Sequence, residues 1–243
     1  MTEVPPTPAA AATVFGTRLE LAERYVALLA DTGISHGLIG PREAPRLWDR
    51  HVLNSAVVAD LFGPGEVADI GSGAGLPGIP LAIVRPDLAI TLVEPLARRT
   101  SWLQSAIDAL GLENVTMHRG RAESLWGERR FAAVTARAVA RTGELARVCL
   151  PLLLAHGSLH ALKGDRAEQE LAEDRDQLLR FGPVQTSISR HGAGLVDPET
   201  VVLTITTTEL VPVPGARRTP SAPQKTGLPK RGRPEPGRRP QSG

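Results

Sequence analysis

The chain has 243 residues, of which 42% are hydrophobic and 22% are charged, so it is long enough for one domain with a sizeable core and terminal extensions. Its single cysteine, Cys149, excludes an internal disulfide and any metal site made of several cysteines, and we expect no metal. No run approaches the ~18 consecutive apolar residues of a membrane span, and the N-terminus lacks the basic and apolar regions of a secretory signal. We therefore expect a cytoplasmic protein without membrane association.

The formal net charge of +2 conceals an uneven distribution. Residues 211–243 carry eight Lys or Arg against one acid, whereas the rest of the chain carries 20 basic and 25 acidic residues. The sequence therefore predicts a mildly acidic domain followed by a basic tail over residues 210–243. Because the tail is rich in Pro, Gly and Arg, it cannot supply a core and is predicted to be disordered.

Two helical stretches precede the first predicted strand. Residues 1–16 begin with a run rich in Pro, Ala and Thr and are predicted to be disordered. From residue 17, apolar side chains recur at helical spacing as far as Leu29, and a second helical stretch runs from about Leu47 to Phe62. Residues 17–62 are therefore expected to form a helical cap. Since the cap lies outside the predicted nucleotide-binding unit, it is the expected place for substrate contacts.

The most informative stretch is residues 66–80, where a short apolar strand leads into a glycine-dense turn and then into a helix. Pro77 suits the first turn of that helix, where its missing N–H costs nothing. Four glycines allow a tight turn and a close approach of a ligand to the backbone. They are Gly71, Gly73, Gly75 and Gly78.

Two ligand classes compete for this loop. Gly73-x-Gly75-x-x-Gly78 matches the dinucleotide fingerprint. The longer pattern from Asp69 to Gly75, acidic-x-Gly-x-Gly-x-Gly, resembles motif I of the class I S-adenosylmethionine-dependent methyltransferases. A carboxylate at Asp69 would repel a pyrophosphate but attract an ammonium or a sulfonium, which favours a methyltransferase over a dinucleotide enzyme or a loop without a ligand.

Strands and helices alternate after the loop. The expected strands cover residues 89–94, 115–120, 131–136, 157–164, 183–190 and 200–208, and the expected helices cover residues 96–110, 145–154 and 168–180. This alternation predicts an α/β fold of the doubly wound, Rossmann-like type over residues 63–209, with ligands at the carboxyl ends of the strands. The last two strands have no helix between them, which predicts an antiparallel pair and a mixed seven-stranded sheet with helices on both faces.

Three strand ends carry candidate ligand-binding residues. Glu94 ends the second strand about 20 residues past the loop, where such folds place a carboxylate on the ribose hydroxyls, although strand-end acids also serve as solvated caps. Ala122 and Glu123 follow the third strand, where they could read an adenine edge, or Glu123 could be a first-turn helix acid. Arg137 ends the fourth strand and could pair with a carboxylate or a phosphate, or remain solvated.

Several segments together give a more specific resemblance. They are residues 50–55 (Arg-His-Val-Leu-Asn-Ser), residues 69–81, Arg85-Pro86, Arg137-Ala138 and residues 161–164 (Ala-Leu-Lys-Gly). They resemble the bacterial 16S rRNA guanine-N7 methyltransferase family, RsmG, formerly called glucose-inhibited division protein B, over roughly residues 17–208. The resemblance implies a class I methyltransferase fold and transfer of a methyl group from S-adenosylmethionine to N7 of one guanosine in the decoding-region loop of 16S rRNA.

The resemblance also implies cofactor contacts. They fall at Gly71, Leu76, Ala122, Glu123 and Arg137, beside the positions Asp69, Gly73, Gly75 and Glu94 that the loop and strand ends indicate. Two positions depart from the family pattern. Residues 37–39 read Gly-Leu-Ile where the family often has Asn-Leu-Thr, and Glu94 stands where many members have Asp.

On the substrate side, the candidates are Arg50 and His51 of the cap and Lys163 at the end of the fifth strand. Neutral guanine N7 carries a lone pair and no proton, so methyl transfer requires alignment and no general base. We accordingly expect no catalytic dyad, since none of the six histidines has an obvious carboxylate partner in the sequence.

The expected partner is 16S rRNA in a folded or 30S-like small-subunit particle, because N7 lies on the major-groove edge and a paired guanosine would be out of reach. We expect the protein to act as a monomer. Two other classes remain open: a non-enzymatic rRNA-binding or ribosome-assembly factor, and a small-molecule methyltransferase on the same fold.

Overall fold

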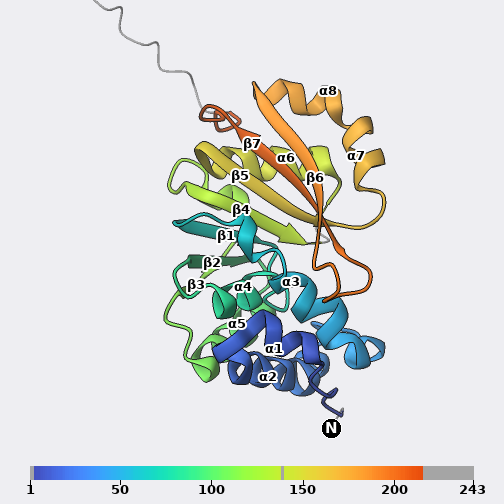
Figure 1. Cartoon of the computed structure of the whole chain (residues 1–243). Coiled ribbons are helices and arrows are strands. Elements are labelled where there is room, and N and C mark those ends of the chain that lie inside the picture. Colours follow the sequence, from blue (N-terminus) through green and yellow to red (C-terminus); the bar gives the residue numbers. More distant parts are fainter. Residues whose placement is uncertain (1–2, 138–139, 216–243) are drawn as a thin grey trace, which may run out of the picture.

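A seven-stranded sheet organises the fold, and the computed structural model of the chain describes residues 3–137 and 140–215 (Figure 1). The strands are β1 (Glu66–Ile70), β2 (Ala89–Glu94), β3 (Val115–Arg119), β4 (Phe131–Arg137), β5 (Leu153–Lys163), β6 (Val184–His191) and β7 (Thr200–Thr207), in the order β3-β2-β1-β4-β5-β7-β6. The pairs among β1 to β5 are parallel, whereas β7 runs antiparallel to both β5 and β6. The predicted mixed sheet with an antiparallel terminal pair is confirmed.

Helices cover both faces of the sheet. They are α4 (Gly78–Val84), α5 (Ala97–Leu110), α6 (Thr142–Cys149), α7 (Ala167–Glu173) and α8 (Arg175–Leu178), with 3-10 turns η6 (Ala122–Leu125), η7 (Leu150–Leu152) and η8 (Leu179–Phe181). Successive strand residues point to opposite faces, so Val67 of β1 joins the core under α4 and α5, while its neighbour Ala68 joins the core under α6. Both faces of the parallel part are therefore buried, as this sheet type requires.

The region before β1 is helical and packs against α4 and α5 (Figure 1). Its elements are α1 (Ala9–Phe15), η1 (Gly16–Arg18), α2 (Leu19–Leu28), η2 (Leu29–Gly33), η3 (Pro41–Arg46), η4 (Leu47–Leu53), α3 (Asn54–Ala56) and η5 (Ala59–Leu61). Tyr25 and Trp48 of this region belong to the same buried cluster as the side chains of α4 and α5. One continuous core thus joins the N-terminal helices to the sheet, and dividing the chain into a cap and a larger domain at residue 63 stays a prediction.

The prediction that residues 1–16 are disordered is wrong for α1. Ala11 and Phe15 are buried in this helix, and the Phe15 ring meets Trp48 edge to face at 6.4 Å between ring centroids. An alanine run has the highest intrinsic helix propensity, and packing of a single aromatic side chain adds the tertiary contact that a short helix needs.

Around β5 the element boundaries also differ from the prediction. Helix α6 ends at Cys149, before Pro151, and β5 begins at Leu153 instead of residue 157. Its first residue pairs with Phe131 and the ladder resumes only at Ser158, with His156 between them at φ 63°. The residues between form an irregular bulge, which periodicity cannot show.

The predicted tail begins later than residue 210. Val211 is buried, and its carbonyl accepts a hydrogen bond from Arg130 at 3.1 Å, so this part of the chain packs on the domain. The remainder of the basic tail, residues 216–243, lies outside the described residues. Within residues 3–137 and 140–215, no helix combines the length and apolar character that crossing a membrane demands.

Candidate functional site

The glycine loop leaves the carboxyl end of β1, next to the point where β1 and β4 are neighbours and the strand order reverses. Such a switch point is where open α/β sheets bind ligands. Gly71, Gly73 and Gly75 all have positive φ, at 70°, 58° and 92°. The N–H groups of Gly71 and Ser72 both donate to the Val93 carbonyl, at 2.9 and 3.2 Å, which holds the loop against the end of β2.

Asp69 lies beneath the loop and is fully buried. Its Oδ2 accepts a hydrogen bond from the Gly78 N–H at 3.1 Å, at the start of α4, and its Oδ1 has no partner among the described residues. Burial raises the pKa of this carboxyl to about 7, against the lowering effect of the Gly78 N–H. Asp69 therefore anchors the loop and the helix from below, and it does not line the cavity above them.

At Gly75 and Gly78, internal packing leaves no room for a side chain. A Cβ on Gly75 would lie 2.5 Å from Ile79, and a Cβ on Gly78 would lie 2.3 Å from Leu92. A Cβ on Gly73 would meet only the Gly71 carbonyl, at 3.8 Å, so Gly73 faces open space. Of these three glycines, Gly73 is the one at which a ligand can approach the backbone.

Glu94 ends β2 with its side chain buried. Its two carboxylate oxygens accept from the N–H groups of Gly73 at 3.1 Å and Leu96 at 3.0 Å, and Arg99 lies 3.5 Å away. The side chain thus ties the loop to the end of β2. Each oxygen of a carboxylate can accept more than one hydrogen bond, so Glu94 keeps acceptor capacity toward the cavity that it lines.

Three adjoining cavities open at this edge of the sheet. A cavity of about 640 Å³, the loop cavity, is lined by Gly71, Gly73, Leu76, Glu94 and Arg137, together with Glu43 and His51 of the N-terminal helices. A cavity of about 250 Å³, the β3 cavity, shares Gly71 with it and contains Ala122 and Glu123. A cavity of about 490 Å³, the β5 cavity, shares His51 and Arg137 with the loop cavity and contains Arg50 and Lys163.

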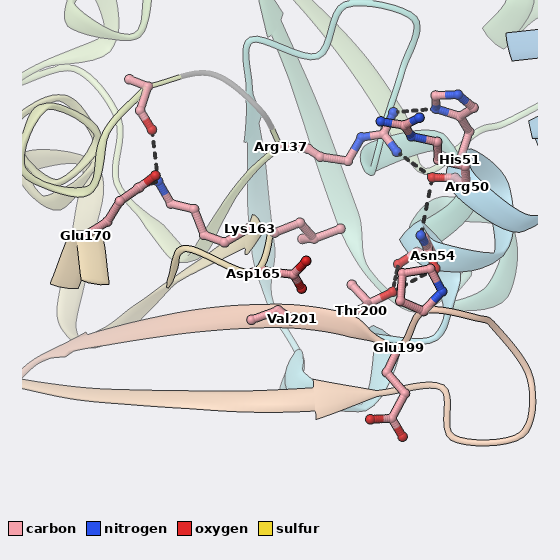
Figure 2. Close-up of a pocket in the computed structure, with 14 residues that line it drawn as sticks. Arg50, His51, Asn54, Arg137, Lys163, Asp165, Glu170, Glu199, Thr200 and Val201 are labelled. Carbon is pink, nitrogen blue, oxygen red and sulfur yellow. Dashed lines mark hydrogen bonds and ion pairs between the residues drawn. The ribbon is translucent and has the colours of Figure 1, made fainter. Parts of the chain in front are cut away.

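Arg137 stands where the loop cavity and the β5 cavity meet. Its guanidinium donates from Nη1 to the Arg50 carbonyl at 3.2 Å and from Nη2 to His51 Nδ1 at 2.9 Å, and Figure 2 shows these contacts converging from β4 and η4. His51 Nε2 lies 2.9 Å from Glu43 Oε2. Burial lowers the pKa of Arg137 from its usual value, and burial followed by the charge of Arg137 lowers the pKa of His51 to about 4.

The prediction that no histidine has a carboxylate partner is wrong for His51. Glu43 stands eight residues before His51, a separation that in one continuous α-helix would place the two residues about 12 Å apart. The chain changes between them from the 3-10 helix η3 to the π-helical η4, and this change brings the two side chains together. No sequence signal available from one chain would have revealed the pair.

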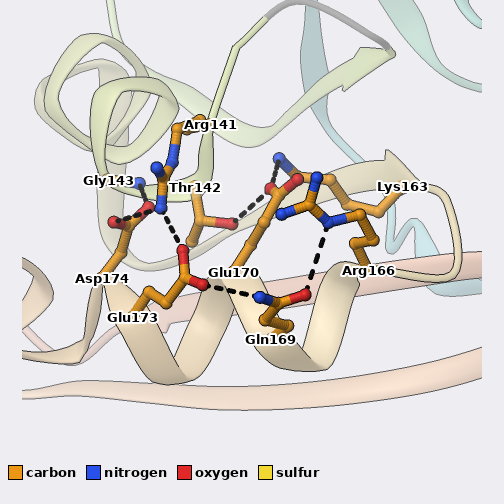
Figure 3. A network of polar contacts seen from close by, with 9 residues as sticks. All are labelled: Arg141, Thr142, Gly143, Lys163, Arg166, Gln169, Glu170, Glu173 and Asp174. Atoms are coloured by element: carbon orange, nitrogen blue, oxygen red, sulfur yellow. Dashed lines mark hydrogen bonds and ion pairs between the residues drawn. The ribbon is translucent and has the colours of Figure 1, made fainter.

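Lys163 is less available than expected. Its ammonium donates to the Ala140 carbonyl at 2.9 Å and to Glu170 Oε2 at 2.8 Å, and only 9% of the side chain is exposed. Figure 3 shows that Thr142 also contacts Glu170, and that the preceding residue, Arg141, pairs with Glu173 and Asp174. In this conformation the network holds α7 on the start of α6, and Lys163 lines the edge of the β5 cavity with its charge paired.

The remaining candidates are more exposed. Arg50 is 52% exposed and lies 3.5 Å from Glu43. Glu123 is 35% exposed and faces Arg147 at 3.7 Å, at the rim of the β3 cavity. Within residues 3–137 and 140–215, no cluster of three or more His, Cys, Asp or Glu side chains is arranged to hold a metal ion.

Sequence comparisons give a consistent result. The sequence model of the GidB family, described as rRNA small subunit methyltransferase G, matches residues 18–195. A protein of Thermobifida fusca named ribosomal RNA small subunit methyltransferase G is 52% identical over 227 residues, which cover 92% of this chain and 95% of the relative. A protein of the same name from Mycolicibacterium smegmatis is 49% identical over 204 residues, which cover 82% of this chain and 86% of the relative.

Solved structures agree on the fold. M. jannaschii TYW2 in complex with AdoMet aligns with a TM-score of 0.51 and 15% identity over 66% of this chain and 76% of that chain. Trm5b from Pyrococcus abyssi aligns with a TM-score of 0.50 and 16% identity over 69% of this chain and 49% of that chain. At these identities the likeness concerns the fold alone, and it confirms the predicted class I methyltransferase architecture.

Proposed function

Because this chain belongs to the GidB family of rRNA small subunit methyltransferases, we propose that it transfers the methyl group of S-adenosylmethionine to N7 of a guanosine in the decoding-region loop of 16S rRNA. One observation carries the proposal: the glycine loop and the ends of β2, β3 and β4 surround adjoining cavities at a single edge of the sheet. That is the edge where this fold binds ligands.

The residues present fit the cofactor. The loop cavity is within the usual size range for small-molecule sites, and Gly73 leaves the backbone open to it. The spare acceptor capacity of Glu94 suits ribose hydroxyls, and Ala122 and Glu123 of the β3 cavity suit an adenine edge. Asp69, buried below the loop, contributes a nearby negative charge when it is ionised and favours a cationic ligand through the field.

Arg137 is proposed as the partner of the cofactor's carboxylate. It lines the loop cavity, and among the described residues only the Arg50 carbonyl and His51 accept from its five N–H groups, so three are without a partner there and suit a ligand. The other guanidinium of that cavity, on Arg99, already lies 3.5 Å from Glu94. A planar guanidinium also matches a carboxylate with two parallel hydrogen bonds.

The β5 cavity is proposed as the place of the target guanosine. It adjoins the loop cavity through Arg137 and His51, so a base there would face the methyl donor. Exposed Arg50 suits a phosphate contact, and Lys163 becomes available to RNA only when its pairing with Glu170 is given up. His51 has both ring nitrogens in contacts with protein groups, so its role is to position neighbours.

The proposed methyl transfer requires the protein to align the methyl group with guanine N7. Bound S-adenosylmethionine supplies an electrophilic methyl group on a sulfonium, and guanine N7 offers a lone pair without a proton. His51 cannot serve as a general base while its Nδ1 accepts from Arg137 and its Nε2 faces Glu43. What the chain supplies is binding, orientation and exclusion of water where the cavities meet.

One comparison of rates and one binding measurement test the function. We expect a small-subunit particle or folded precursor rRNA to be methylated far faster than free guanosine, with the product mapped to one N7. Equal rates on free guanosine would favour a small-molecule methyltransferase. Cofactor and rRNA binding without any methyl transfer would favour a non-enzymatic assembly factor.

The site of action and the assembly state belong to the same proposal. Because the substrate is rRNA of the small subunit, we place the protein in the cytoplasm, acting as a monomer on a folded particle. Sedimentation at micromolar concentration tests the monomer, with and without the particle.

A further inference from the structure

A chain of hydrogen bonds runs from the N-terminal helices to the end of β4. Arginine has only donors, so the contact of 2.9 Å between Arg137 Nη2 and His51 Nδ1 requires Nδ1 to be the acceptor, without a proton. The proton of the neutral ring then sits on Nε2, which donates to Glu43 Oε2 at 2.9 Å. The two contacts together select one tautomer of His51.

The other states of His51 break this chain. In the opposite tautomer, an N–H would face the guanidinium of Arg137 and a lone pair would face the carboxylate of Glu43. In the doubly protonated ring, an N–H and a positive charge would face the guanidinium. Burial and the charge of Arg137 hold the pKa of His51 at about 4, so the ring is neutral around neutral pH.

We propose that Glu43 is a positioning residue, which through the Nε2-protonated tautomer of His51 orients the Arg137 guanidinium toward the carboxylate of the bound cofactor. The inference rests on the proposed function for the identity of that ligand. Arg137 has a further anchor in the Arg50 carbonyl at 3.2 Å, so within the described residues both hydrogen-bond partners of its guanidinium come from residues 43–51. Within the described residues no carboxylate forms an ion pair with Arg137, which leaves its charge for the ligand.

Glu43 suits this role better than its neighbours do. It lines the loop cavity, and 29% of its side chain is exposed. Its pKa is lowered from the usual value, and the hydrogen bond with His51 is the largest cause. The carboxylate therefore stays ionised and keeps accepting from His51 at neutral pH. Asp49, an exposed acid of η4 with no hydrogen bond or ion pair among those described, makes no comparable contact.

The experiment compares Glu43→Leu and Glu43→Gln with the control Asp49→Leu. Leucine removes the acceptor at similar size, whereas glutamine keeps a carbonyl oxygen that His51 Nε2–H can reach. Calorimetry measures the affinity of each chain for S-adenosylmethionine and for decarboxylated S-adenosylmethionine, which lacks the group that Arg137 would hold. Nitrogen-15 NMR of the imidazole reports the tautomer of His51 in the wild-type chain, and thermal unfolding monitors each variant.

We expect Glu43→Leu to weaken S-adenosylmethionine binding about tenfold and to leave binding of the decarboxylated analogue unchanged. Glu43→Gln should recover most of the loss, and Asp49→Leu should bind as the wild type does. The wild-type His51 should show a protonated Nε2 and an unprotonated Nδ1.

Three results would overturn the inference: an equal loss for both ligands, no loss in Glu43→Leu, or a proton on Nδ1 of the wild-type ring. The NMR measurement of the His51 tautomer uses the wild-type chain, so it tests the inference even if Glu43→Leu fails to fold. A wild-type chain that binds the cofactor through its carboxylate yet methylates no rRNA would overturn the proposed function and leave the role of Glu43 standing.

Discussion

Asp69→Asn tests the buried carboxylate under the glycine loop. The pKa of this group is about 7 in the folded chain and near 4 in an unfolded one. The folded state therefore holds the proton more tightly, so Asp69 contributes stability that is complete below about pH 4 and is lost as pH rises through about 7. Asparagine has the same shape and does not titrate, and it keeps an oxygen for the Gly78 N–H.

The expected change in unfolding free energy with pH follows from the uptake of one proton by Asp69. Between about pH 5 and 7 the unfolded Asp69 is ionised and the folded one is largely protonated, so the unfolding free energy of the wild type should fall by about 1.4 kcal/mol per pH unit relative to Asp69→Asn. The accumulated difference is about 2 kcal/mol. Asparagine also places an amide group at the position where Oδ1 has no partner. This should shift the unfolding free energy of Asp69→Asn by about 1–3 kcal/mol at every pH without changing how it depends on pH.

Urea unfolding of both chains at about pH 5, 6, 7 and 8 measures this difference, and contributions from His51 and His160, whose pKa values are both lowered to about 4, cancel between the two chains. The reasoning fails if the difference in unfolding free energy stays constant over that range within about 0.5 kcal/mol. Such a result would mean that Asp69 is ionised over the whole pH range and that hydrogen bonds from the loop offset the effect of burial on its pKa.

Four further outcomes are expected. Gly78→Ala should lower the unfolding free energy by about 1–3 kcal/mol in urea titrations, because its Cβ would lie 2.3 Å from Leu92 Cδ2; an unchanged midpoint would mean that the helix start shifts freely. Glu94→Ala should weaken S-adenosylmethionine binding at least about tenfold by calorimetry, and retained affinity would remove Glu94 from the ribose site. With folded RNA and with cofactor kept saturating at every pH, so that titration of Asp69 near pH 7 does not change cofactor occupancy, the single-turnover rate should vary less than about twofold between roughly pH 6.5 and 8.5, since the pKa of His51 is about 4. A steep rise abolished by His51→Ala would show general-base chemistry. Deleting residues 216–243, which spares buried Val211, should flatten the salt dependence of rRNA affinity by about 0.7 per lost phosphate contact, and an identical slope would leave the tail without a role in RNA binding.

The sequence predicted the sheet well because its signals are local. The apolar runs that become β2 and α5 end within a residue of their predicted bounds, and the missing helix before the last strand correctly indicated an antiparallel pair. Helix α1 and the start of β5 were missed for physical reasons. The first depends on tertiary packing, which buries Ala11 and Phe15 and sets Phe15 against Trp48, and the second on a bulge that periodicity does not encode.

The site was predictable in position and less so in detail. Glu94 and Arg137 were predicted because they end β2 and β4, the two parallel strands on either side of β1, and the structure brings both to the loop cavity. Asp69 is the penultimate residue of β1, and its side chain lies beneath the loop, where its carboxylate accepts a hydrogen bond from the first N–H of α4. Glu43 gave no signal at all, since its contact with His51 depends on a change of helix type within residues 41–53.

The position of His51 bears on why this site can work without a catalytic dyad. A histidine beside a carboxylate usually suggests a general base, and the spacing of 2.9 Å to Glu43 fits that pattern. Here the other ring nitrogen accepts from Arg137, so the lone pair that a base would need is already used. Glu43 and His51, which could otherwise form a catalytic dyad, instead hold the guanidinium of Arg137 between the loop cavity and the β5 cavity. If the acceptor is guanine N7, as proposed, it has no proton to lose, and a fixed guanidinium that holds the proposed cofactor is then more useful than a base.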